Sequence, residues 1–92
     1  MENAKRIVNH LLNKKMIACA NFLPIYSAFL WQGKIEEGQE IVTLLKTTKE
    51  NTRIVEEEIK KIHNYEIPCI IEIQAKSNSE YEDWIYEETI DY

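Results

Sequence analysis

The scarcity of turn-forming residues is the strongest constraint on this chain. Its 92 residues include only two glycines and two prolines, so few positions favour a tight turn or a break. We therefore expect a small number of long elements within one domain, residues 1–92. A domain of this size buries only about 60–65% of the surface that its unfolded chain exposes, so association with further copies is expected to add stability.

A stretch of β-branched, aromatic and small residues predicts a long strand over residues 17–31. Because proline has no N–H for a ladder, Pro24 indicates an edge strand or a bulge. Residues 32–34 predict a turn, and the chain returns from Ile35. Residues 40–46 alternate enough to form the partner strand, which completes a long antiparallel hairpin.

Apolar residues at helical spacing predict a first helix over residues 2–15, with Asn3 as its cap. Its apolar stripe comprises Ala4, Ile7, Val8, Leu11 and Leu12. His10 falls on the polar side of this helix, so we expect it at the surface.

Two capping boxes, residues 47–50 and 79–82, predict the starts of two further helices. The buried stripe of the first is expected to comprise Ile54, Val55, Ile59 and Ile62. The second box opens a short terminal helix. Between them, Pro68 bars continuation of the helix and residues 69–75 predict a strand.

This order of elements is that of a ferredoxin-like domain without its first strand. It predicts an α+β fold with an antiparallel sheet, helices on one face and a short C-terminal helix. The first strand of such a sheet is central, so its absence leaves two strands without a hydrogen-bonding neighbour. We expect either a longer natural chain, with an apolar strand before Met1, or a weakened sheet.

Charge and hydropathy exclude several classes of function. A formal net charge of −5 is repelled by phosphate backbones, so we expect no nucleic-acid partner. No apolar run approaches the roughly 20 residues of a membrane span, and no signal-peptide pattern opens the chain. We therefore expect no membrane association and a cytoplasmic location, where Cys19 and Cys69 are buried thiols and not a disulfide.

The candidate metal ligands lie just beyond the second long helix. A neutral His63 nitrogen, with Glu66 adding an oxygen, suits a borderline metal ion, and Cys69 is close in sequence. The alternative is a His63 that caps the helix. Cys19, in an apolar strand, is expected to serve packing.

A second group of residues suits a ligand cleft or a contact between subunits. Trp31 offers a large apolar anchor at the hairpin turn. Lys46 leads into a helix start and favours an anion there, the alternative being a solvated lysine. The whole group comprises Trp31, Gly33, Lys34, Lys46, Tyr65, Tyr81 and Trp84.

No catalytic motif is present, so we expect that the protein is not an enzyme. His63 and Glu66 as an acid–base pair are the remaining catalytic interpretation. The acidic runs 56–58 and 80–83 are expected to be solvated helix faces.

Five blocks, in order and across nearly the whole chain, resemble the divalent-cation tolerance (CutA) family. They are residues 17–24 (IACANFLP, followed by Ser27), 31–36 (WQGKIE), 45–48 (LKTT), 63–68 (HNYEIP) and 81–85 (YEDWI). The resemblance implies a ferredoxin-like subunit, a tight homotrimer, a cytoplasmic location and a role in tolerance to copper and other divalent cations, with no established reaction. It also implies a rival role, as a sensing module that binds ligands in clefts between subunits.

The chain departs from this family at two positions that concern metal. The family's first strand, where some members carry a proposed copper-binding cysteine, has no counterpart before Glu2. A further histidine of some members is Ile62 here. Of the proposed copper ligands only His63 carries over, and one imidazole is not a complete site for copper or another divalent cation.

Overall fold

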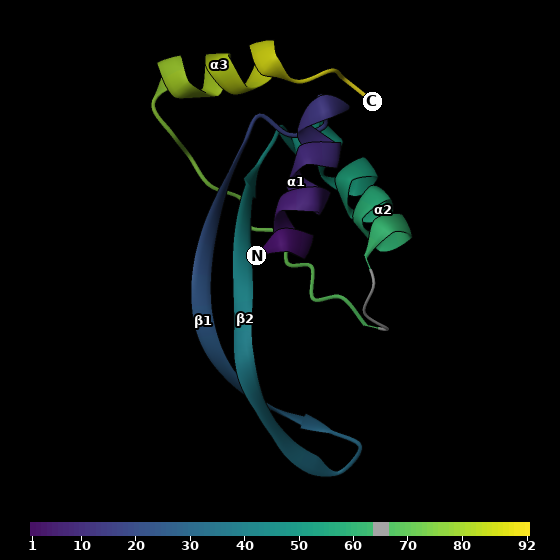
Figure 1. Ribbon diagram of the computed structural model, residues 1–92. Coiled ribbons are helices and arrows are strands. Elements are labelled where there is room, and N and C mark those ends of the chain that lie inside the picture. Colours follow the sequence, from purple (N-terminus) through teal and green to yellow (C-terminus); the bar gives the residue numbers. More distant parts are fainter. Residues whose placement is uncertain (64–66) are drawn as a thin grey trace.

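The fold is a long antiparallel hairpin with two helices on one face and a third helix across its open end (Figure 1). The computed structural model describes residues 1–63 and 67–92. The elements in chain order are α1 (Glu2–Asn13), β1 (Cys19–Trp31), β2 (Lys34–Lys46), the short 3-10 helix η1 (Lys49–Asn51), α2 (Thr52–Ile62) and α3 (Ser79–Glu88). The α+β class predicted from the sequence is confirmed, and the arrangement fits a ferredoxin-like subunit. No helix among the described residues is long and apolar enough to cross a membrane.

The two strands pair without interruption from Cys19 opposite Lys46 to Trp31 opposite Lys34. Gln32 and Gly33 join them with φ of +52° and +80°. Positive φ at both central residues is typical of the tight turns that suit twisted strands, and glycine adopts it without strain. The predicted hairpin is therefore confirmed, and its second strand is longer than residues 40–46.

The core lies between the helices and the half of the hairpin nearest its open end. Its buried members are Val8, Leu11, Met16, Ile17, Val55 and Ile59, and the side chains packed against them include Ala20, Phe22 and Leu45. The helical spacing of apolar residues therefore identified the buried sides of both helices, except that Leu12 of the first stripe is 37% exposed. Ala20 and Phe22 face the helices. Because side chains alternate along a strand, the residues next to them in sequence face away from the helices.

That opposite side of the hairpin carries exposed apolar side chains, and we call it the open face. It comprises Leu23, Ile25, Val42 and Leu44, which are between 36% and 45% exposed. Leu23 lies directly opposite Val42 in the strand register. Helices thus cover the first face only near the open end of the hairpin, because Leu30 and Ile35, which lie on that face near the turn, are each 75% exposed. The opposite face is apolar and open.

A row of basic side chains on α1 clamps α2. Arg6, His10 and Lys14 follow one another at four-residue spacing and so share a helix face. His10 Nε2 lies 2.5 Å from Glu58 Oε2, and Lys14 Nζ donates to the same oxygen at 3.0 Å. Arg6 Nη2 donates to the Ile62 carbonyl at 2.9 Å. Glu58 is only 7% exposed, so the prediction of a wholly solvated acidic run was wrong. The His10 side chain is 35% exposed, in keeping with the predicted surface position, but it pairs with this buried carboxylate.

The C-terminal end of α1 is closed by a left-handed residue. Lys15 has φ +56°, Met16 N–H donates to the Leu11 carbonyl at 3.0 Å, and Lys15 N–H donates to the Leu12 carbonyl at 3.0 Å. This pair of bonds is the Schellman arrangement, in which glycine is the usual left-handed residue.

The predicted strand at residues 69–75 is wrong, because residues 67–78 contain no strand or helix. In a ferredoxin-like sheet its neighbour is the strand before the first helix. No described segment pairs with residues 69–75. Consequently Ile71 and Ile73 are 75% and 76% exposed.

The predicted helix caps are also wrong, although the helices exist. The residues at the cap positions of α1, η1 and α3 are Met1, Thr48 and Asn78, and not the predicted ones. None of the three makes a side-chain cap bond. The Thr47 hydroxyl instead donates to the Met16 carbonyl at 2.6 Å, and so ties the end of β2 to the start of β1. The hydroxyl that the local sequence pattern predicted as a helix cap is therefore bonded to a residue distant in sequence.

The left-handed Lys15 yields a prediction about stability. Replacing it with glycine removes the contact between Cβ and the backbone, so Lys15→Gly is expected to raise the free energy of unfolding by about 1 kcal/mol. Lys15→Ala removes the same charge but keeps the Cβ atom, so it is the matched control and should change little. Urea unfolding of the three proteins checks this, and equal gains in both variants would contradict it.

The clamp at Glu58 yields a prediction about pH. Hydrogen bonds from His10 and then Lys14 hold the pKa of Glu58 below its ordinary value of 4.5. A depressed carboxyl pKa stabilises the fold above the unfolded pKa, and this contribution is lost as the pH falls through the folded value. Between pH 6 and pH 3 the wild type should therefore lose more stability than Glu58→Gln.

The control for this experiment is Glu57→Gln, which removes an exposed carboxylate from the same helix. It should follow the wild-type pH dependence of the unfolding midpoint. Parallel curves for wild type and Glu58→Gln would show that the clamp does not account for the sensitivity to acid.

Candidate functional site

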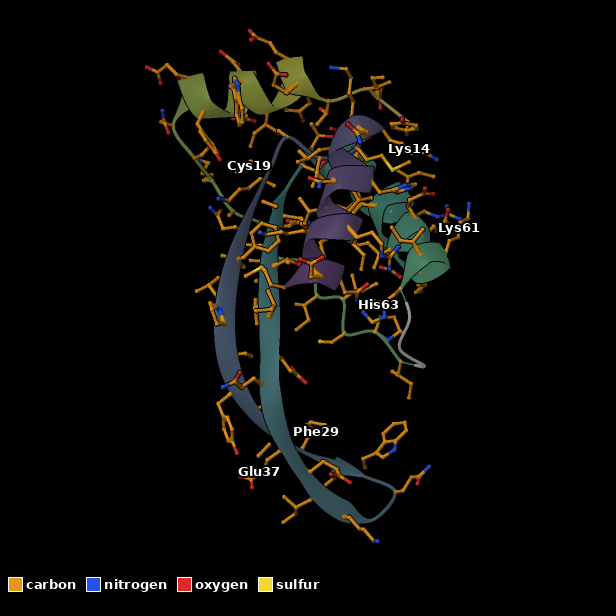
Figure 2. All side chains as sticks on the ribbon, in the orientation of Figure 1. Lys14, Cys19, Phe29, Glu37, Lys61 and His63 are labelled. Carbon is orange, nitrogen blue, oxygen red and sulfur yellow. The ribbon has the colours of Figure 1, made fainter. Side chains whose placement is uncertain are left out.

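His63 takes its position from the end of α2. Its N–H donates to the Ile59 carbonyl at 2.8 Å, after which the backbone leaves the helix with φ −76° and ψ 140°. Arg6 of α1 bonds the neighbouring Ile62 carbonyl, so α1 helps to fix the place where α2 ends. The half-buried His63 thus ends α2 through its backbone, and its imidazole lies at the edge of the helical layer (Figure 2). Both interpretations of this imidazole, as a metal ligand and as a helix cap, stay predictions.

Of the other predicted metal ligands, Cys69 lies among the described residues. Glu66 and Tyr65 fall outside the described residues. Cys69 is exposed and Cys19 is half-buried, and both are free thiols, so the prediction of no disulfide agrees with the structure but burial of Cys69 does not. Among residues 1–63 and 67–92, no three histidine, cysteine or acidic side chains gather closely enough to hold a metal ion.

At the open end of the hairpin, several of the predicted cleft residues come together. Lys46 lies opposite Cys19 in the strand register, and its ammonium donates to the Asn21 side-chain oxygen. A hydrogen bond with Cys19 raises the pKa of the Tyr81 phenol and ties α3 to the start of β1. The Tyr81 and Trp84 rings lie 5.6 Å apart at a tilt of 36°.

The remaining predicted cleft residues lie at the far end of the hairpin. Trp31 and Lys34 are the last cross-strand pair and Gly33 is in the turn, beyond the part that the helices cover (Figure 1). The structure therefore divides the predicted group between the two ends of one hairpin. A single chain does not place Trp31 beside Lys46.

The best-defined hollows of the described part lie elsewhere, on both sides of Glu50. One of about 200 Å³ is lined by Thr48, Glu50, Tyr86, Thr89 and Asp91. The other, of about 250 Å³, is lined by Glu50, Arg53, Ile54, Glu57 and Tyr92. Between them the Tyr86 hydroxyl donates to Glu50 Oε1 at 2.9 Å, which raises the pKa of Tyr86. Both hollows are open to solvent and shallow.

Sequence reasoning missed two polar residues that the fold buries. Glu58 lies on the buried side of α2, three residues after Val55 and next to Ile59, so its place on the apolar stripe was a usable signal. Asn51 is 0% exposed, and its partners lie near the C-terminus. No local pattern indicated that contact.

Comparison with known proteins gives consistent results. The profile of the CutA1 divalent ion tolerance protein family matches residues 1–88. A divalent-cation tolerance protein CutA from Archaeoglobus fulgidus is 42% identical over 92 residues, which is 99% of this chain and 89% of the relative.

Solved structures agree with the sequence comparison. CutA1 from Pyrococcus horikoshii superposes with a TM-score of 0.94 at 40% identity, over 97% of this chain and 88% of that one. The A. fulgidus protein, described as a periplasmic divalent cation tolerance protein, gives 0.92 at 43% identity, over 96% and 87%. With a profile match over almost its whole length and relatives of this similarity, the chain belongs to the CutA1 divalent ion tolerance protein family.

Proposed function

We propose that this member of the divalent-cation tolerance family acts as a cytoplasmic homotrimer that binds copper or a related divalent cation through His63, and that it is not an enzyme. The open face of the hairpin is the observation that carries the proposal. Two free cysteines support a reducing, cytoplasmic location.

The apolar side chains of the open face favour a trimer. Leu23, Ile25, Val42 and Leu44 form a contiguous patch, and monomeric proteins of this size rarely leave such a patch uncovered. Packing the same face of further copies against it would remove these side chains from water. The trimer is the assembly that the family resemblance implies.

Metal binding through His63 also calls for more than one copy of the chain. Among the described residues of one chain, no two further ligands gather with His63. Copper and zinc sites, however, are built from several imidazole, thiolate or carboxylate groups. Imidazole nitrogen favours copper or zinc over calcium and magnesium, which prefer oxygen ligands. Three copies supply three imidazoles, so we propose that the site depends on assembly.

Charging the open face tests the trimer. Val42→Lys places an ammonium among apolar side chains that the assembly would bury, so the variant should be a folded monomer of 10.9 kDa. Gln39→Lys adds the same charge to the same strand on the opposite face, and should remain at three times that mass. Light scattering after size exclusion measures both, and a wild-type monomer at micromolar concentration would contradict the proposal.

Titration with Cu(II), Cu(I) and Zn(II) tests the metal site. The wild type should bind stoichiometrically below micromolar concentration, and His63→Ala should weaken binding by at least tenfold. His10→Gln removes the other histidine and keeps a hydrogen-bond donor for Glu58, so it should bind as the wild type does. Binding that is weak and unchanged in His63→Ala would rule out His63 as the ligand.

A further inference from the structure

Residues 89–92 form a strap that crosses the molecule after α3. The Ile90 N–H donates to the Lys15 carbonyl at 2.9 Å, and the Tyr92 hydroxyl donates to the Lys14 carbonyl. These two carbonyls belong to the end of α1, where helical carbonyl groups have no partner within the helix. The strap thus supplies the donors that the end of α1 lacks.

Asn51 holds the same strap from the other side. Its Nδ2 donates to the Ile90 carbonyl at 2.8 Å, and its Oδ1 accepts the Tyr92 N–H at 3.1 Å. One buried carboxamide therefore bonds a C=O and an N–H two residues apart, as a neighbouring peptide group does in a strand pair. Both ends of this side chain are satisfied, and its 0% exposure depends on the strap.

The strap is held largely through its backbone. Ile90 and Tyr92 are 49% and 53% exposed, so about half of the surface of each stays in contact with water. The hollows on either side of Glu50 flank it, with Thr89 and Asp91 lining one and Tyr92 lining the other. Hydrogen bonds of this kind are individually weak in water, because water competes for the same groups.

We propose that Asn51 and the carbonyls of Lys14 and Lys15 form a peptide-binding site, which the strap occupies within its own chain. The ligand is an extended peptide with the chemistry of the strap: an apolar residue that offers both backbone groups, an acidic residue and a tyrosine. Such a segment of another protein replaces the strap and makes the same hydrogen bonds.

This site is separate from the proposed metal and trimer functions. It includes neither His63, at the end of α2, nor the open face of the hairpin. Its chemistry is recognition of a peptide backbone, to which the Tyr92 hydroxyl adds a bond to the Lys14 carbonyl. The trimer and metal proposals can therefore fail without affecting it.

Fluorescence polarisation tests the proposal in the full chain. The probe is a labelled peptide with the sequence of residues 86–92, YEETIDY. Ile90→Pro combined with Tyr92→Phe removes the two strap bonds to α1, so the strap competes less and the peptide should bind this variant at least tenfold more tightly than wild type. Adding Asn51→Asp replaces the carboxamide donor and should abolish the gain.

A second peptide separates backbone recognition from adhesion. N-methylation at the position equivalent to Ile90 removes the N–H that meets the Lys15 carbonyl, so this peptide should bind at least tenfold more weakly. Three results would each overturn the proposal: equal binding of both peptides, equal binding with and without Asn51→Asp, or no binding to the variant whose strap is weakened.

Hydrogen exchange in the wild-type protein tests the proposal without any variant. The Ile90 and Tyr92 amides should exchange much faster than those of Val55 and Ile59, because an exchangeable strap opens without global unfolding. Excess unlabelled peptide should speed their exchange further. Strap amides as protected as the core, and unaffected by the peptide, would show that the strap is a fixed part of the fold.

Discussion

Unbroken pairing between β1 and β2 determines how the rest of the chain is arranged. Each of the thirteen residues of β1 has a partner in β2, so no bulge reverses the alternation of side chains along the hairpin. Ala20, Phe22 and Leu45 consequently face the helices, while Leu23 and Val42 face away. The same register places Lys46 and Trp31 at opposite ends. Core, open face and the division of the candidate residues therefore share one cause.

The parts of the fold that depend on local chemistry were predictable from the sequence. Gln32 and Gly33 provide the turn, and apolar residues at helical spacing identify the buried sides of α1 and α2. Residues 69–75 have the composition of a strand, but pairing requires a neighbour that composition does not report. Likewise, the Thr47 hydroxyl bonds to Met16, and only the tertiary fold brings that carbonyl within reach.

The candidate site was predictable only as a set of residue types. Resemblance selected His63, and the structure places it at the end of α2. Its possible partners Tyr65 and Glu66 are outside the described residues, so that grouping remains a prediction. The burial of Glu58 and Asn51 depends on α1 and on the C-terminal residues, which are 44 and 39 positions away in sequence. Spacing within a helix cannot reveal such contacts.

Pro24 and the acidic residues of β2 have a consequence for solubility. Beyond the helices, the hairpin presents an outer edge of β1 that offers a template for pairing with other chains in the manner of amyloid. Pro24 interrupts the row of amide donors along this edge. Glu36, Glu37 and Glu40 add negative charge to the neighbouring strand, so hairpins stacked in register would repel one another. The same protruding arm that exposes apolar side chains thus carries its own protection against uncontrolled aggregation.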